Sequence, residues 1–137
     1  MSFLLDTNVI SEIQRGDRCH QAVRSWWSRA DASEVYLSVL VIGEIQRGIE
    51  RLTPGDPGRA RQFQSWLESI IRGFDGRLLD VDLEVARVWG KLSANRTLPL
   101  VDGLLAATAV VHDLTLVTRN TTDIRGTDAR CLNPFEA

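Results

Sequence analysis

Cysteine is scarce in this chain of 137 residues, and its two copies, Cys19 and Cys131, stand near opposite ends. Neither belongs to a Cys-x-x-Cys pair or a Cys/His cluster, so the usual ligands of a zinc site are missing. The sequence allows a disulfide between them, although reduced thiols agree better with a cytoplasmic protein.

Long hydrophobic runs are also missing, and none approaches the roughly 18–20 residues that cross a membrane. The opening from Met1 to Asp6 has no basic region and too short an apolar stretch for a signal peptide. We therefore expect a cytoplasmic protein that forms one domain over residues 1–137, which is long enough for a substantial core.

Several motifs of well-known chemistry are absent. The chain has no Walker lysine motif, no GxGxxG loop and no GxSxG nucleophile elbow. Of its two histidines, His20 lies in a polar segment and His112 ends an apolar helical stretch, where it suits the helix dipole. We expect structural roles for both.

Lysine is nearly absent, because Lys91 is the only lysine among 16 basic residues. Arginine favours two-point contacts with phosphate, but a GC-rich genome explains this preference more simply. The formal net charge is −2, which is not the overall charge of a protein that holds nucleic acid by its general field.

Apolar segments alternate with helical patterns, which is typical of βαβ units and an α/β fold with a parallel sheet. Helical spacing is clearest over residues 59–74, and shorter patterns predict helices over about 23–30 and 82–95. Residues 103–111 are apolar all round, so we expect a buried helix there. An exposed loop is predicted over 53–58. Strands are predicted near residues 2–6, 35–38, 77–81, 114–118 and 129–132, the last at an edge of the sheet.

Four carboxylates occupy positions in or next to apolar segments, where an acid is hard to explain without a positive charge nearby. Asp6 ends an apolar strand, Glu44 interrupts the apolar face of a helix, Asp102 opens an apolar helix, and Asp123 follows a strand and its polar turn. Parallel strands converge on one crevice at their carboxyl ends. Like charges gathered there need compensation, and oxygen ligands suit a hard cation such as Mg²⁺ or Mn²⁺.

Each acid also has a simpler explanation. Asp6 and Asp102 are candidate helix N-caps, although Thr7 or Asn8 could cap the first helix and leave Asp6 surplus. The carboxylate of Glu44 lies at the margin of the apolar arc, from which it could reach water. The residue Asp123 is an ordinary loop acid on turn composition. Two neighbours of Asp123 are possible hydrogen-bond partners, namely Thr118 and Asn120.

With these residues in place, the chain resembles the PIN domain family, and more narrowly its VapC-type toxins with the FitB-like subgroup. Four segments carry the resemblance, and Leu132-Asn133-Pro134-Phe135 near the end agrees with the subgroup. The segments are Leu4 to Glu12, Ser38 to Ile45, Leu98 to Ala109 and Leu114 to Asp123.

The resemblance implies a single PIN domain over residues 1–137, built as a three-layer α/β/α sandwich around a parallel sheet of four to five strands. It also implies a Mg²⁺- or Mn²⁺-dependent ribonuclease whose catalytic and metal-binding residues are Asp6, Glu44, Asp102 and Asp123. The fourth position is the least secure, because the family varies there and sometimes relies on a neighbouring Asn or Thr.

In that reading Asp6 and Asp102 hold the metal directly, while Glu44 and Asp123 act through water or hold a second ion. A metal-activated water then hydrolyses an RNA phosphodiester bond. We expect weaker contributions to RNA contact from Arg119 and Arg96, for which surface ion pairing is the simpler role.

The resemblance further implies a cognate antitoxin, a homodimer, and a larger assembly that reaches DNA through the antitoxin. Trp26, Trp27, Trp66 and Trp89 fall on predicted helices, and those not needed in the core could line a groove for a partner helix.

Two rival functions remain at this level. A receiver-like phosphoryl-transfer domain also places acids at strand ends, but it needs a second acid that Asp6-Thr7-Asn8 lacks. A catalytically silent PIN-like module that only binds RNA or protein would keep the fold without the chemistry.

Overall fold

Five short parallel strands form the centre of the molecule, in the order β3-β2-β1-β4-β5. The computed structural model describes residues 1–136. Each strand lies within its predicted range, and β5 is an edge strand as expected. The strands are β1 (Phe3–Leu5), β2 (Val35–Ser38), β3 (Leu78–Leu79), β4 (Thr115–Val117) and β5 (Arg130–Leu132).

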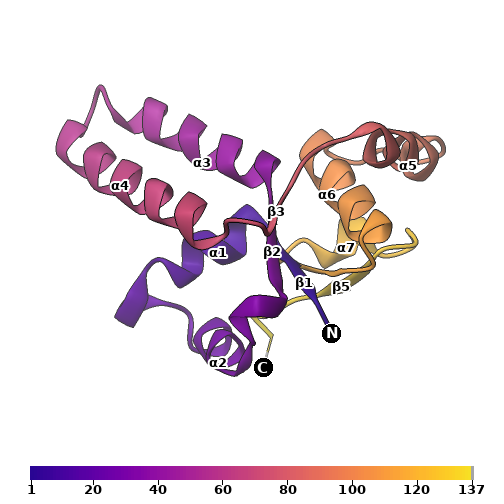
Figure 1. Ribbon diagram of the computed structural model, residues 1–137, viewed down its shortest axis with the longest axis horizontal. Helices are drawn as coiled ribbons and strands as arrows, with labels where there is room; N and C mark the ends of the chain where they lie inside the picture. The colour runs from indigo at the N-terminus through magenta and orange to yellow at the C-terminus, as the bar shows by residue number, and fades with distance from the viewer. Residues whose placement is uncertain (137) are drawn as a thin grey trace.

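Helices cover the sheet (Figure 1), which confirms the predicted α/β/α architecture. Two pairs pack closely, α3 with α4 and α5 with α6. Two short 3-10 helices, η1 (Gly16–Arg18) and η2 (Ala32–Glu34), connect elements near the N-terminus. The α-helices are α1 (Thr7–Ile13), α2 (Gln21–Arg29), α3 (Val39–Leu52), α4 (Pro57–Gly73), α5 (Leu83–Ser93), α6 (Leu100–Val111) and α7 (Thr121–Ile124).

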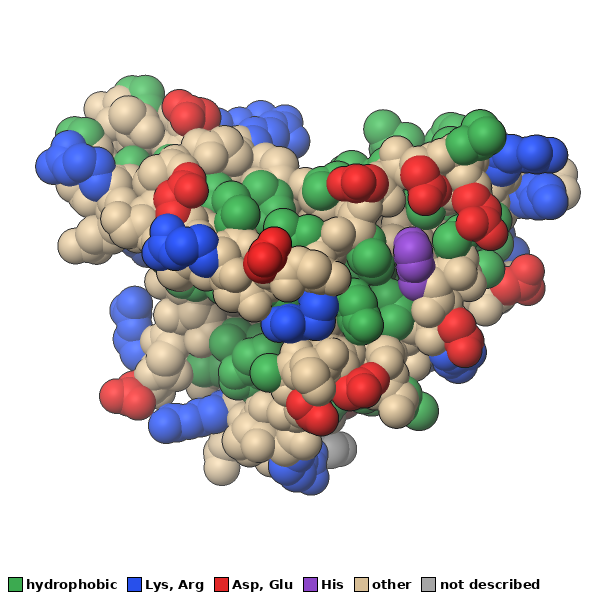
Figure 2. Space-filling view, in the orientation of Figure 1, with side chains coloured by type: hydrophobic (Ala, Val, Ile, Leu, Met, Phe, Trp, Pro, Cys, Tyr) green, Lys and Arg blue, Asp and Glu red, His purple; other side chains and the backbone are tan. Residues whose placement is uncertain are grey.

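Strand β1 occupies the middle of the sheet, with β2 and β3 on one side and β4 and β5 on the other. Leu5 pairs with Val117 in register, and the Asp6 N–H donates to the Val117 carbonyl at 2.9 Å. The order of strands therefore reverses at β1, and such a switch point opens a crevice beyond the carboxyl ends of the strands. Figure 2 shows the surface hollowed between α3 and α6, the side toward which β2 runs (Figure 1).

The core fills both sides of the sheet with aliphatic side chains, among them the fully buried Leu4, Leu37, Leu67 and Leu105. Helix α6 is the apolar helix that the sequence predicts, and six of its twelve residues are buried. Its close approach to α5 depends on Gly103, because a Cβ there would lie 3.1 Å from the indole of Trp89.

Several boundaries differ from those predicted. Helix α6 begins three residues before Gly103, and α4 begins at Pro57, inside the expected loop. Proline suits the first turn of a helix, and the Asp56 carboxylate caps α4 by accepting the Arg59 N–H at 3.1 Å. The 53–58 segment is accordingly a shorter turn than its composition suggests.

Both cysteines are free and half-buried, as expected for reduced thiols. Among residues 1–136, no helix is both long enough and apolar enough to span a bilayer.

Candidate functional site

Asp6 is a buried carboxylate, 5% exposed, at the carboxyl end of the central strand. Its Oδ1 accepts the Thr7 N–H at 2.7 Å, and its Oδ2 accepts the Thr118 hydroxyl at 2.7 Å. The Asn8 amide donates to the same Oδ2 at 3.3 Å. Three donors around one carboxylate fix its orientation.

Asp6 is also the N-cap of α1, so the expectation that Thr7 or Asn8 would cap this helix was wrong. Asp6 has an extended backbone, and the helix begins at the next residue, which leaves Thr7 and Asn8 inside it. Their side chains are therefore free for other contacts.

Those contacts join Asp6-Thr7-Asn8 to two distant segments. The Thr7 hydroxyl donates to Oε1 of Glu44 on α3, and the side-chain Oδ1 of Asn8 accepts the backbone N–H of Arg119 at 3.2 Å. Thr118 closes the link, since its hydroxyl also accepts the Asn120 N–H at 3.0 Å. Roles for Thr7 and Asn8 beyond capping were missed from the sequence, although polar residues directly after a strand end were the available signal.

Glu44 is half-buried on α3, at the margin of the apolar face as predicted. It opens onto a groove of about 260 Å³ between α1, α3 and α4. The groove runs from Thr7 and Glu44 over an apolar surface to Trp66. Its other lining residues are Ser11, Gln14, Ile45, Gly48, Ile49, Leu52 and Phe63.

Asp102 is half-buried in the first turn of α6, and the N-cap position belongs to Pro99. The capping role considered for Asp102 is therefore wrong, because the helix starts two residues before it. Desolvation raises the pKa of Asp102 to about 6, and the negative charges of Asp6, Asp123 and Glu44 add to this rise. The charges of the other three acids therefore reach Asp102.

Asp123 lies on the short helix α7 and is exposed, so the sequence interpretation as a loop acid was wrong. Asn120 is exposed at the N-cap position of α7, where its side chain makes no capping hydrogen bond. Both residues lie on the segment whose backbone N–H groups are bound by the side chains of Asn8 and Thr118. The charge of Asp123 reaches Asp102 from there, although Asp123 and Asn120 are both exposed.

The acids suit a hard cation by their chemistry, since carboxylate oxygens are the ligands that Mg²⁺ and Mn²⁺ prefer. Within residues 1–136, no three His, Cys, Asp or Glu side chains converge closely enough to hold an ion by themselves. Mg²⁺ is commonly bound by one or two carboxylates and several waters. A cation would also offset the mutual repulsion that raises the pKa of Asp102. The donor set therefore fits such an ion.

The two arginines proposed for RNA contact have other contacts here. The guanidinium of Arg119 lies over the Phe135 ring, 3.7 Å from its centroid. Arg96 donates to the carbonyl of Gly126 at 2.7 Å and to that of Arg125 at 3.4 Å. Neither forms an ion pair among residues 1–136, so the simpler role considered for them was wrong, while both remain exposed.

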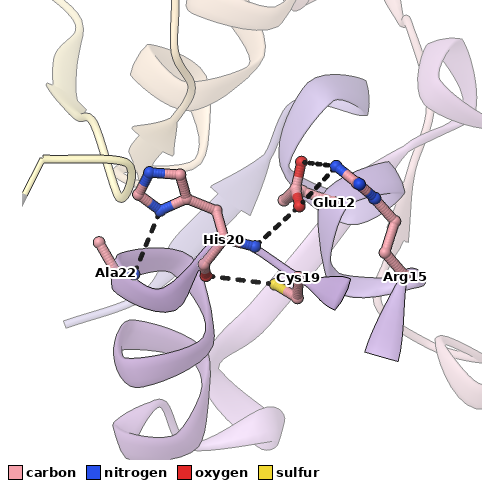
Figure 3. Close-up of polar contacts among 5 residues, drawn as sticks. All are labelled: Glu12, Arg15, Cys19, His20 and Ala22. Carbon is pink, nitrogen blue, oxygen red and sulfur yellow. Dashed lines mark hydrogen bonds and ion pairs between the residues drawn. The ribbon is translucent and has the colours of Figure 1, made fainter. Parts of the chain in front are cut away.

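His20 has the structural role that the sequence predicts. Its ring Nδ1 accepts the Ala22 N–H at 3.2 Å and caps α2. The backbone N–H of His20 donates to the Glu12 carboxylate at 2.8 Å (Figure 3). His112 is the C-cap of α6, also as predicted.

Comparisons with known proteins extend over nearly the whole chain. A sequence model of the PIN domain matches residues 3–128. VapC ribonuclease Y4jK of Sinorhizobium fredii is 32% identical, covering 97% of this chain and 97% of the relative. Toxin FitB of Neisseria gonorrhoeae is 33% identical, covering 96% and 97%. A chain in the structure of FitAB bound to an IR36 DNA fragment has a TM-score of 0.88 at 31% identity, covering 98% and 96%.

Proposed function

Because this chain belongs to the PIN domain family, we propose that it is a Mg²⁺- or Mn²⁺-dependent endoribonuclease acting as the toxin of a toxin–antitoxin pair. The observation that carries the proposal is that three acids, Asp6, Asp123 and Glu44, lie near enough to Asp102 for their charges to raise its pKa, at the switch point of the sheet. The names of the relatives support the same activity, since one is a VapC ribonuclease and another is Toxin FitB.

In this proposal Asp6 and Asp102 hold the ion directly, and Glu44 and Asp123 act through water or hold a second ion. When bound, the ion would lower the pKa of a coordinated water and stabilise charge that develops on the phosphoryl group. The family resemblance implies that water breaks the P–O3′ bond, which leaves 5′-phosphate and 3′-hydroxyl ends. Hydrolysis by water agrees with this, because the RNA 2′-hydroxyl is not needed as the nucleophile.

The chain's other residues keep these carboxylates in place. Thr118 and Asn8 orient Asp6 through its Oδ2, and Thr7 orients Glu44. Asn8 also holds the backbone at Arg119, and through it the segment that carries Asp123. Such partners of metal-binding side chains restrict their rotation.

We further propose that a cognate antitoxin places a helix in the groove between α1, α3 and α4. The apolar side chains of Ile45, Leu52 and Trp66 suit the apolar face of such a helix. The same groove reaches Thr7 and Glu44, so an occupied groove would obstruct the acids. A homodimer, and DNA binding through the antitoxin, complete the proposed assembly in a cytoplasmic setting.

The test incubates the purified chain, free of any partner, with tRNA, rRNA and a single-stranded RNA in Mg²⁺ or Mn²⁺. Controls contain EDTA, Asp6→Ala or Asp102→Asn. We expect cleavage that requires the metal and falls at least about 100-fold in Asp102→Asn, since even outer partners of metal ligands contribute about 10–100-fold. Cleavage by Asp102→Asn at the wild-type rate would contradict the proposal.

A catalytically silent binding module is the second candidate, because no three acids within residues 1–136 converge on one point. Calorimetry with Mn²⁺ separates the two candidates. Absence of both metal binding and cleavage favours the silent module, whereas metal binding without cleavage indicates a substrate outside the RNAs used. Membership of the PIN family removes the receiver-like alternative.

A further inference from the structure

A second, strongly basic cleft lies beside the groove described above, between the end of α1, η1 and the first turns of α4. Its volume is about 570 Å³, and it contains three arginines and no acid, although the whole chain carries a net charge of −2. The lining residues of this arginine cleft are Ser11, Gln14, Arg15, Arg18, Arg59, Gln62 and Phe63.

The arginines differ in how they are held. Arg18 and Arg59 are exposed, and neither forms an ion pair with any residue between 1 and 136. Arg15 pairs with Glu12 at 3.2 Å, and Glu12 is itself fixed by the His20 N–H (Figure 3). The cleft therefore combines two cations without a carboxylate partner and one that is held in place.

The arginine cleft is continuous with the groove that contains Glu44, because Ser11, Gln14 and Phe63 line both. Helix α1 starts beside the acids and runs toward the arginines. Gln14 comes seven positions after Thr7, which corresponds to about 10 Å along the helix. A flexible chain leaving the acidic site could reach the arginines within that distance.

We propose that the arginine cleft binds the phosphate backbone of single-stranded RNA whose neighbouring linkage lies at the carboxylate site. This inference rests on the proposed ribonuclease function. Guanidinium groups bind phosphate through two parallel hydrogen bonds. Sites for single-stranded RNA also combine positive charge with an aromatic platform for a base. The guanidinium of Arg59 lies over the Phe63 ring, 5.4 Å from its centroid, and a guanidinium plane is itself a surface on which an RNA base can stack.

The experiment measures RNA binding without cleavage. The parent is full-length Asp102→Asn in EDTA, and the probe is a fluorescent 12-nucleotide oligouridylate followed by anisotropy from low to high salt. Arg18→Ala with Arg59→Ala is added to the parent. We expect at least about a tenfold weaker affinity at low salt, because two charge-assisted contacts are lost. The slope of log K against log salt should fall by about 0.7 for each lost contact.

Arg61→Ala with Arg72→Ala is the matched control. Both residues are exposed on α4 and do not line the cleft. At about 100° per residue, Arg61 lies roughly 200° around the helix from Arg59, and Arg72 lies within about 20° of Arg61. The control removes the same charge from the opposite face of α4, and we expect its affinity and salt slope to match the parent.

Three results would overturn the inference. Equal losses in the two double variants would mean that general charge, not the cleft, attracts RNA. Unchanged RNA binding in Arg18→Ala/Arg59→Ala, with loss of binding to an oligoglutamate peptide, would assign the cleft to an acidic protein segment. A parent that does not bind the oligouridylate would overturn the inference about the cleft, whereas the proposed ribonuclease function fails only if metal-dependent cleavage is absent, so the two failures are distinguished.

Discussion

The position of Asp6 in the sequence suggests two roles for its carboxylate, helix capping and metal binding, and the two are compatible. One oxygen caps α1 through the Thr7 N–H, and the other accepts the Thr118 hydroxyl. Each carboxylate oxygen has two acceptor positions, so capping does not exhaust the capacity of Asp6 to bind a cation. Capping by Asp6 is therefore compatible with the proposed role as a metal ligand.

Thr118→Val tests whether orientation of Asp6 matters for the metal. Valine keeps the shape of threonine but removes the donor to Asp6 and the acceptor for the Asn120 N–H. We expect Mn²⁺ affinity, measured by calorimetry, to fall about 10–100-fold. Thr122→Val, at an exposed position of α7, is the matched control and should bind Mn²⁺ like the wild type. Wild-type affinity in Thr118→Val would show that Asp6 needs no such support.

The raised pKa of Asp102 predicts a pH-dependent stability in the metal-free chain. Folding raises this pKa from 3.8 to about 6, so the folded state binds the proton more tightly than the unfolded state. The stabilisation is complete below pH 3.8 and is lost as the pH rises through about 6. We expect urea unfolding in EDTA to show this decline in the wild type, and a flatter profile in Asp102→Asn. Identical pH profiles for the two chains would count against the assignment.

At the scale of elements, α6 carries both a core face and an exposed start. Leu105 is fully buried, whereas Leu100, in the first turn of the same helix, is 60% exposed. We expect Leu105→Ala to lower the free energy of unfolding by about 2–5 kcal/mol, because it leaves a cavity in the core. Leu100→Ala should change it by less than about 0.5 kcal/mol. Urea denaturation measures both, and similar losses would mean that α6 packs differently.

The elements themselves were largely predictable, and their ends were less so. The apolar spacing predicted a helix over 59–74, and α4 spans Pro57–Gly73. Helix α6 starts earlier than its apolar run, because Leu100 and Val101 join the helix ahead of its buried part. Periodicity reports the buried face, whereas caps and first turns depend on which backbone groups find partners.

At the scale of the whole molecule, metal binding should stabilise the fold. An ion that binds only the folded chain contributes about 2.7 kcal/mol at 100 times its dissociation constant, which corresponds to roughly 10 °C in Tm for a chain of this size. We expect this increase with Mn²⁺ in differential scanning fluorimetry, and its loss in Asp102→Asn.

Asp75→Asn is the control for that measurement, because Asp75 is an exposed acid in the turn after α4. It should keep the full increase in Tm. An equal increase with NaCl at the same ionic strength would indicate screening of surface charge instead of a bound ion.

The sequence by itself determined the class of fold, the five strands and the family resemblance, because hydrophobic period and strand-end acids are local features of the chain. It also placed Asp6, Glu44, Asp102 and Asp123 as candidates, and their functional roles remain predictions. Tertiary structure decided which side chains meet: Thr7 with Glu44, Asn8 with the backbone of Arg119, and Thr118 with Asp6. It also brought three arginines into one cleft. These contacts join residues up to 112 positions apart, so they follow from the packing of strands and helices and not from any local pattern.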